Sequence, residues 1–271
     1  MTEEHKGYRT ELYPPMRRFA VDAGWRARRR HIIHGLLELD VTKAREHIRK
    51  HRAQTGERLS FTAFVITCLA RAAKSNDHVH AVLNWRNQLV IFDDVNVNTM
   101  VEVQSGDIKV AMPYIIEAAD KKTYRQIHDE IRAVQARPAQ TQELRFMRWF
   151  LVLPGALRRT FYGLVTKNPN LLRRYTASVL ITAVGMFGSG AGWGIPAASF
   201  SLTVTLGGIA KKPGVVADEI SIREYLHVTL SFDHDIIDGA PAARFAEEFR
   251  TLIESGYGLV EAADAWTAAT P

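Results

Sequence analysis

The 271-residue sequence predicts an α/β fold in which helices pack on a mixed β-sheet. Three observations lead to this class. Short runs rich in β-branched and aromatic residues predict strands, apolar residues at helical spacing predict helices, and the strands come in groups instead of alternating strictly with helices. A grouped order favours a mixed sheet over a purely parallel one.

The strand pattern occurs at the start, in the middle and near the end of the chain. Turn residues separate the central strands, and a proline, Pro113, lies within one of them. The predicted strands cover residues 31–40, 81–85, 88–92, 95–103, 108–116, 177–184, 199–209 and 221–232.

Four helices are predicted with recognisable ends. They cover residues 42–53, 61–73, 122–137 and 239–254. Asp40 or Thr42 opens the first, and Thr55-Gly56 ends it. Ser60 is the expected N-cap of the second, and Pro138 closes the third.

The composition indicates one globular domain. The apolar content is 46%, and neither an internal repeat nor a Gly/Ser linker divides the chain. We expect a single domain over residues 1–271, with residues 1–16 as an N-terminal extension and residues 262–271 as a C-terminal tail.

The net charge of +6 comes with no nucleic-acid-binding motif. Arginines cluster within residues 17–30, and because no binding motif accompanies them we expect no nucleic-acid partner. The single cysteine, Cys68, excludes an internal disulfide and lies in an apolar helix, which predicts a buried thiol and a reducing compartment. With a polar N-terminus, this predicts a cytoplasmic location.

Residues 146–165 are the nearest candidate for a membrane segment. Arg158 and Arg159 would be costly at the centre of a bilayer. The pattern therefore favours packed helices broken at Pro154-Gly155 over a membrane-surface hairpin.

The most informative stretch is Ser231-Phe-Asp-His-Asp-Ile-Ile-Asp-Gly-Ala240. It puts His234 between carboxylates, on the connection from a predicted strand to a predicted helix. Gly239 would let the chain reverse tightly, and Asp238 could cap the helix and hold a neighbouring side chain. A histidine placed in this way suits a general base.

Asp233-His234-x-x-x-Asp238-Gly239-Ala240 resembles the active-site signature of the dihydrolipoamide acyltransferase (E2) catalytic domain of 2-oxo acid dehydrogenase complexes. The resemblance runs in order from about residue 17 to about residue 261. It includes Leu37-Glu-Leu-Asp-Val-Thr42 and Ile181-Thr-Ala-Val-Gly185 but matches poorly over residues 142–176. It implies the two-layer fold of chloramphenicol acetyltransferase, a mixed sheet with helices packed on it.

The resemblance also implies a reaction and its residues. His234 would take the proton from a coenzyme A or dihydrolipoyl thiol, and the thiolate would attack the thioester without an acyl-enzyme. Thr182 would stabilise the oxyanion, and Asp238 would pair with an arginine, for which Arg28, Arg29 and Arg30 are candidates. CoA or acyl-CoA is then a substrate, and no metal and no lipoyl attachment site are expected on this chain.

Asp235 departs from the family, which usually has arginine after the histidine. If Asp235 pointed at His234 it would favour the imidazolium and weaken the base, whereas a solvent-facing carboxylate would do little. The reversed charge therefore leaves two hypotheses open. It is either a feature that tunes specificity or a sign that the activity has been lost.

The sequence leaves three functions open. The first is a CoA-dependent acyltransferase that serves a thiol such as a dihydrolipoyl group on a separate carrier or E2 subunit. The others are a catalytically silent trimeric scaffold and a small-molecule O-acetyltransferase. In each, the resemblance implies a homotrimer with sites between subunits, His234 from one chain and Thr182 from its neighbour.

Overall fold

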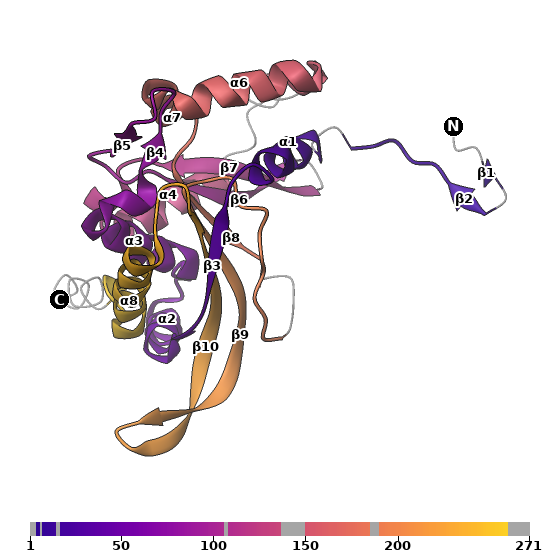
Figure 1. The fold of residues 1–271 in the computed structure, drawn as a ribbon. Helices are drawn as coiled ribbons and strands as arrows, with labels where there is room; N and C mark the ends of the chain where they lie inside the picture. Colours follow the sequence, from indigo (N-terminus) through magenta and orange to yellow (C-terminus); the bar gives the residue numbers. More distant parts are fainter. Residues whose placement is uncertain are drawn as a thin grey trace.

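A six-stranded sheet organises the protein (Figure 1). The computed structural model describes residues 4–5, 7–14, 17–105, 108–136, 150–184 and 190–259. The spatial order of the strands is β3-β10-β9-β8-β6-β7. They are β3 (Ile32–Asp40), β6 (Val97–Ser105), β7 (Ile108–Ile116), β8 (Val179–Ala183), β9 (Leu202–Val216) and β10 (Glu219–Asp233).

The sheet is mixed, as the sequence predicted. β10 runs antiparallel to both β3 and β9, and β6 runs antiparallel to β7. The short strand β8 joins these two antiparallel groups, because it is parallel to β6 on one side and to β9 on the other. Pro113 lies in β7, at the edge of the sheet, where a missing N–H is tolerated.

Two of the predicted strands lie outside this sheet. The segments predicted at residues 81–85 and 88–92 shorten to β4 (Val82–Leu83) and β5 (Leu89–Val90), which form a separate hairpin. A second small hairpin pairs β1 (Glu4–His5) with β2 (Tyr8–Arg9).

Of the helices whose bounds are described, four cover one face of the sheet and three lie towards one end of the molecule (Figure 1). The first group is α2 (Thr42–Thr55), α3 (Phe61–Ser75), α4 (Tyr124–Ala136) and α8 (Gly239–Ser255). The second is α1 (Arg17–Ala27), α6 (Gly155–Lys167) and α7 (Pro169–Tyr175). Single 3-10 turns occur at Asp77–His80 and Ala119–Lys121. The arginine-rich α1 was not predicted, because it lacks a clear apolar period.

The predicted helix ends follow from capping chemistry. The side chain of Ser60 accepts a hydrogen bond from the amide of Ala63 at 3.2 Å and so caps α3. Gly56 ends α2 with a φ of 77°, a left-handed conformation that glycine adopts without strain. Pro138 lies outside the described residues, as do residues 260–271, which include the predicted tail.

The centre of the core is α3, as its continuous apolar pattern predicted. Ten of its residues are buried, and they pack against α8, α4 and the covered face of the sheet. Cys68 is fully buried in this layer, and burial raises the pKa of its thiol. This confirms the interpretation of Cys68 as a structural thiol.

A loop formed by residues 190–200 lies on the sheet near the middle of β9. A Cβ at Gly207 would lie 2.1 Å from the carbonyl oxygen of Gly192, so only glycine allows this approach. Trp193 packs edge-on against the buried His227 and donates from Nε1 to the carbonyl of Leu37 at 3.0 Å. These contacts hold the loop against the strands.

The β9–β10 pair is longer than predicted and extends beyond the rest of the sheet (Figure 1). The prediction ended β9 at residue 209 and began β10 at residue 221, whereas the strands pair from Leu202 to Val216 and from Glu219 to Asp233. The projecting part exposes Val215, Ile220 and Ile222, each more than 70% accessible.

The buried His80 makes the stability of this fold sensitive to acid. Neither ring nitrogen of His80 has a hydrogen-bond partner among the described residues, and burial lowers its pKa to about 4. In the unfolded chain His80 binds a proton near pH 6.5, whereas in the folded chain it does so only near pH 4. Stability should therefore fall by about 3 kcal/mol as the pH drops from about 6.5 to about 4.

We expect His80→Leu to flatten this part of the stability curve, as measured by urea unfolding at several pH values. The neighbouring His78 is exposed, so His78→Gln is the matched control and should keep the slope of the parent. An unchanged slope in His80→Leu would show that another group causes the acid sensitivity.

Candidate active site

His234 lies where the sequence placed it, between the end of β10 at Asp233 and the start of α8 at Gly239. Its backbone amide donates to the carbonyl oxygen of His31 at 2.6 Å. This bond continues the ladder between β10 and β3 by one residue past the pair Asp233 and Ile32. The backbone of the candidate base is thus held by the sheet.

A backbone carbonyl fixes the protonation pattern of the His234 ring. Nδ1 lies 2.7 Å from the carbonyl oxygen of Ile237, which can only accept, so Nδ1 carries the proton. In the neutral ring Nε2 then holds the lone pair. The side chain is 42% accessible, so a group arriving from outside can reach the ring. The geometry suits a general base.

Asp238 occupies the N-cap position of α8 but does not cap it through its side chain. The carboxylate is 89% accessible, and its Oδ1 lies 3.9 Å from Nδ1 of His234. The expectation of a side-chain cap is therefore wrong. The expected glycine turn is also wrong, since Gly239 has no positive φ and a Cβ there would meet nothing within 4 Å.

The arginine that supports this loop is Arg30, and its partner is Asp233 instead of Asp238. The carboxylate of Asp233 is only 5% accessible. Burial raises its pKa, and the charge of Arg30 opposes that effect. Asp233 also accepts from the amide of Asp235 at 3.3 Å. The pair therefore joins the end of α1 to both sides of His234.

The carboxylate of Asp235 contacts His31. Its Oδ1 lies 2.8 Å from Nδ1 of His31, and this hydrogen bond raises the pKa of the His31 imidazole. At the position where the family usually has arginine, this chain therefore has an exposed pair, Asp235 with His31. Sequence reasoning missed His31, because only the β3–β10 register brings it next to Asp235.

Thr182 lies on β8, away from His234 in the same chain. It is opposite Thr205 of β9, and Thr205 is opposite Thr229 of β10, five residues before His234. Strand spacing and rise put the two predicted site residues roughly 20 Å apart within one chain. Thr182 is partly exposed. One chain does not bring the two side chains together, and Gly185 of the same motif lies outside the described residues.

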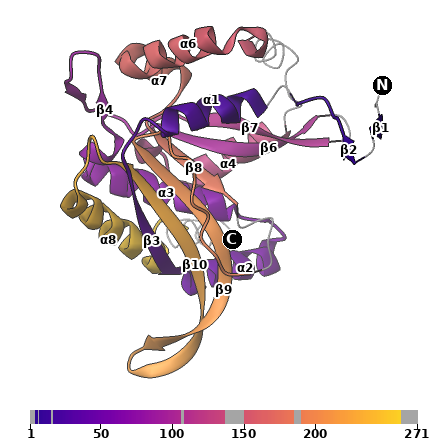
Figure 2. The same ribbon diagram turned by 45° about the vertical axis from the view of Figure 1, so that its right-hand side comes forward.

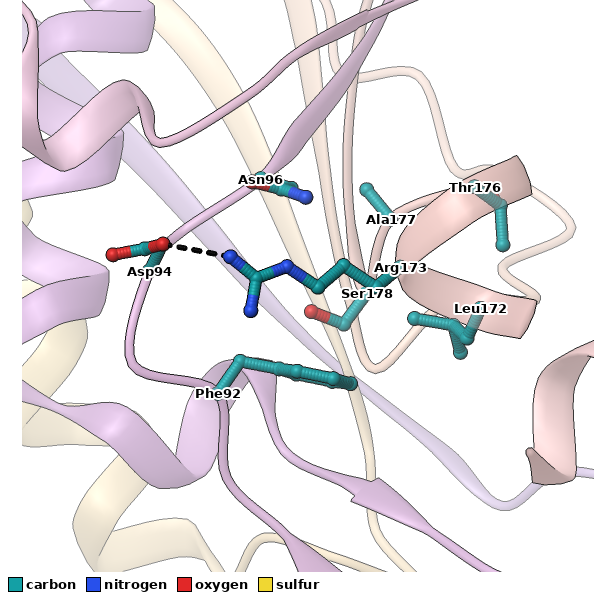
Figure 3. A pocket seen from close by; sticks show the side chains of 8 residues that line it. All are labelled: Phe92, Asp94, Asn96, Leu172, Arg173, Thr176, Ala177 and Ser178. Carbon is teal, nitrogen blue, oxygen red and sulfur yellow. Dashed lines mark hydrogen bonds and ion pairs between the residues drawn. The ribbon is translucent and has the colours of Figure 1, made fainter. Parts of the chain in front are cut away.

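A separate hollow lies between α7 and the segment before β6 (Figure 3). The guanidinium of Arg173 crosses it, and Nη2 donates to Asp94 Oδ2 at 2.9 Å. The predicted site residues are not among its lining. Its lining residues are Phe92, Asp94, Asn96, Leu172, Arg173, Thr176, Ala177 and Ser178. Within the described part of the chain, His, Cys, Asp and Glu do not cluster in a way that would hold a metal ion.

The arrangement defines a protein of the acyltransferase-core fold. A probable dihydrolipoamide acetyltransferase from Listeria monocytogenes superposes with a TM-score of 0.67, at 19% identity, covering 93% of this chain and 96% of that chain. The cubic core of a pyruvate dehydrogenase multienzyme complex gives the same TM-score at 18% identity, covering 94% and 96%. These likenesses confirm the predicted two-layer fold.

The chain belongs to the 2-oxoacid dehydrogenases acyltransferase (catalytic domain) family, whose model matches residues 35–145 and 175–260. It is 26% identical over 240 residues, 86% of this chain, to the acetyltransferase component of a pyruvate dehydrogenase complex from Zymomonas mobilis. It is 24% identical over 226 residues, 83% of this chain, to the succinyltransferase component of a 2-oxoglutarate dehydrogenase complex from Staphylococcus saprophyticus. The chain spans about half the length of these relatives, 47% and 45%.

The Arg30–Asp233 pair should stabilise the fold measurably. Arg30→Gln leaves a buried carboxylate without its cation, so we expect a loss of roughly 2 kcal/mol in the free energy of unfolding. Adding Asp233→Asn should recover part of that loss, because the unpaired charge disappears. Urea unfolding of both single variants and the double variant measures the coupling.

The exposed Arg28 provides the control for this cycle. Arg28→Gln should change the free energy of unfolding by less than about 0.5 kcal/mol. Additive losses in the Arg30→Gln and Asp233→Asn double variant would show that the two side chains are not coupled.

Proposed function

We propose that the protein is a CoA-dependent acyltransferase that moves an acyl group between CoA and a second thiol, such as a dihydrolipoyl group on another chain. The observation that carries the proposal is the Nδ1-protonated His234, held by Ile237 with Nε2 left as an acceptor. Family membership supports it, because the family is one of acyltransferase catalytic domains.

In the proposed reaction Nε2 of His234 removes the proton from the attacking thiol. The thiolate attacks the thioester carbonyl carbon, and the resulting oxyanion accepts a hydrogen bond from the hydroxyl of Thr182. When the intermediate collapses, the carbon–sulfur bond of the original thioester breaks. The leaving thiolate then takes the proton back from His234, so no acyl-enzyme and no net proton change are required.

We propose that this site is completed between subunits of a homotrimer. The roughly 20 Å between His234 and Thr182 in one chain is too long for both to act on the same carbonyl. A neighbouring copy could supply the missing side chain. The exposed apolar residues of the β9–β10 projection, Val215, Ile220 and Ile222, provide surface for such an assembly.

Two other functions remain as alternatives. A catalytically silent scaffold would keep the trimer without the chemistry, and Asp235 was its main support. The contact between Asp235 and His31 weakens that argument, because the negative charge is directed to a different ring. A small-molecule O-acetyltransferase would use the same base with hydroxyl acceptors and is tested by the choice of acceptor.

Two variants test the base and the shared site together. His234→Ala and Thr182→Ala should each lower CoA-dependent transfer to dihydrolipoamide by at least about 100-fold. Mixed trimers of the two variants should recover activity, because about one site in three then combines an intact His234 with an intact Thr182. The assay follows acyl transfer by co-purified, differently tagged chains.

The control mixes two differently tagged preparations of His234→Ala, which should stay inactive. If the His234→Ala and Thr182→Ala mixture also stays inactive while co-purification on both tags shows mixed oligomers, the site is not shared. If the parent protein transfers no acyl group from CoA to thiol, amine or hydroxyl acceptors, the enzyme proposal itself fails.

Asp235 should have little influence on the base. Because its carboxylate is exposed and bonded to His31, we expect Asp235→Asn to change kcat/KM by less than about threefold across the pH range. The measurement is kcat/KM for dihydrolipoamide as a function of pH, with Asp129→Asn, an exposed change on α4, as the control. A tenfold gain in kcat/KM in Asp235→Asn or Asp235→Arg would support the hypothesis that the parent protein is a catalytically silent scaffold.

A further inference from the structure

The segment that the family model leaves unmatched, residues 146–174, includes a helix with an unusual outer face. On α6, Leu157, Phe161 and Leu164 are 57%, 42% and 55% accessible. They lie at positions i, i+4 and i+7, so they form one continuous apolar stripe. Val152, just before the helix, is 76% accessible. We call these four residues the apolar stripe.

The inner side of α6 packs against the rest of the protein, and this packing keeps the apolar stripe on the outside. Arg158 is 6% accessible and donates from Nε to the carboxylate of Asp22 in α1 at 2.7 Å. Val165 is also buried. The following helix, α7, is held by the Arg173–Asp94 contact (Figure 3). The helices therefore pack as the sequence predicted, yet they leave the apolar stripe outside.

The surroundings of the apolar stripe are basic. We define the basic end as residues 17–30 and 150–184, since α1 and α6 lie side by side in both views (Figures 1 and 2). It contains eleven Lys and Arg residues and one acidic residue, Asp22, which is buried. The whole chain carries only +6, so the remainder is net negative. The exposed cations here are Arg17, Arg18, Arg28, Arg29, Lys167, Arg173 and Arg174.

We infer that the apolar stripe and the basic end together form a docking surface for an anionic phospholipid membrane. Apolar side chains on one helix face enter the boundary between headgroups and acyl chains, and basic side chains beside them attract anionic headgroups. The helix would lie in the membrane plane. No helix among the described residues is both long and apolar enough to cross a bilayer.

The apolar stripe and the basic charge together favour an anionic membrane over a nucleic acid or a second copy of the chain. A nucleic acid would use the exposed cations but gain little from Leu157, Phe161 and Leu164. A second copy of the chain would bring an equally basic surface against this one, with repulsion instead of attraction. An anionic lipid surface uses both features at once.

Vesicle co-sedimentation of the full chain tests the inference. The protein should sediment with vesicles of phosphatidylcholine and phosphatidylglycerol and stay soluble with phosphatidylcholine alone, and added salt should weaken binding. Leu157→Ser, Phe161→Ser and Leu164→Ser in one chain should lower partitioning at least about tenfold. Lys167→Gln with Arg174→Gln should lower it severalfold.

Two controls keep the result interpretable. Lys50→Gln with Arg52→Gln removes the same charge from exposed positions of α2 and should leave vesicle binding unchanged. Because Cys68 is buried, Thr160→Cys provides a single labelling position on the outer face of α6. An environment-sensitive dye there should shift to the blue with anionic vesicles, whereas the same dye at Lys50→Cys should not.

Several outcomes would overturn the inference. It fails if the parent protein ignores anionic vesicles, or if the triple serine variant binds them as the parent does while its thermal unfolding is unchanged. It also fails if the triple variant changes the oligomeric state in light scattering, since the apolar stripe would then be a contact between copies. Acyl transfer by the parent is measured separately and does not enter this test.

Discussion

The antiparallel pairing of β10 with β3 is the constraint on which the site depends. Their ladder runs from Tyr225 opposite Asp40 to Asp233 opposite Ile32, and the His234 amide extends it to the carbonyl of His31. A slip of one residue would turn every side chain to the other face. The register therefore fixes the backbone of the base and brings Arg30 and His31 to the carboxylates beside it.

The features that were predicted correctly are local ones. The strand before His234 and the helix after it follow from hydrophobic period, and the cap at Ser60 needs only its own neighbours. The partners of the carboxylates are not local. Arg30 and His31 are separated from Asp233 and Asp235 by more than 200 positions, and only the β3–β10 register decides which arginine meets which carboxylate.

Other features were missed because the sequence carries no signal for them. The carbonyl of Ile237 fixes the His234 tautomer. Every residue has a backbone carbonyl, so the sequence does not show which one contacts the ring. The projecting part of β9 has Lys211, Lys212, Pro213 and Gly214 in a row, a composition typical of a loop, and only its pairing with β10 shows it to be a strand. Thr182 was placed correctly on a strand, but the separation from His234 follows from sheet order alone.

One element, α1, connects the candidate site to the basic end. At one side its Asp22 holds α6 through Arg158, and just beyond its last residue Arg30 holds the loop of His234 through Asp233. Arg26 adds a hydrogen bond to the carbonyl of Ser199, which precedes β9. A ligand that fixes α6 therefore bears on the same short helix that supports the base. The two buried ion pairs therefore attach the segment before His234 and the unmatched segment to the same short helix and the turn that follows it.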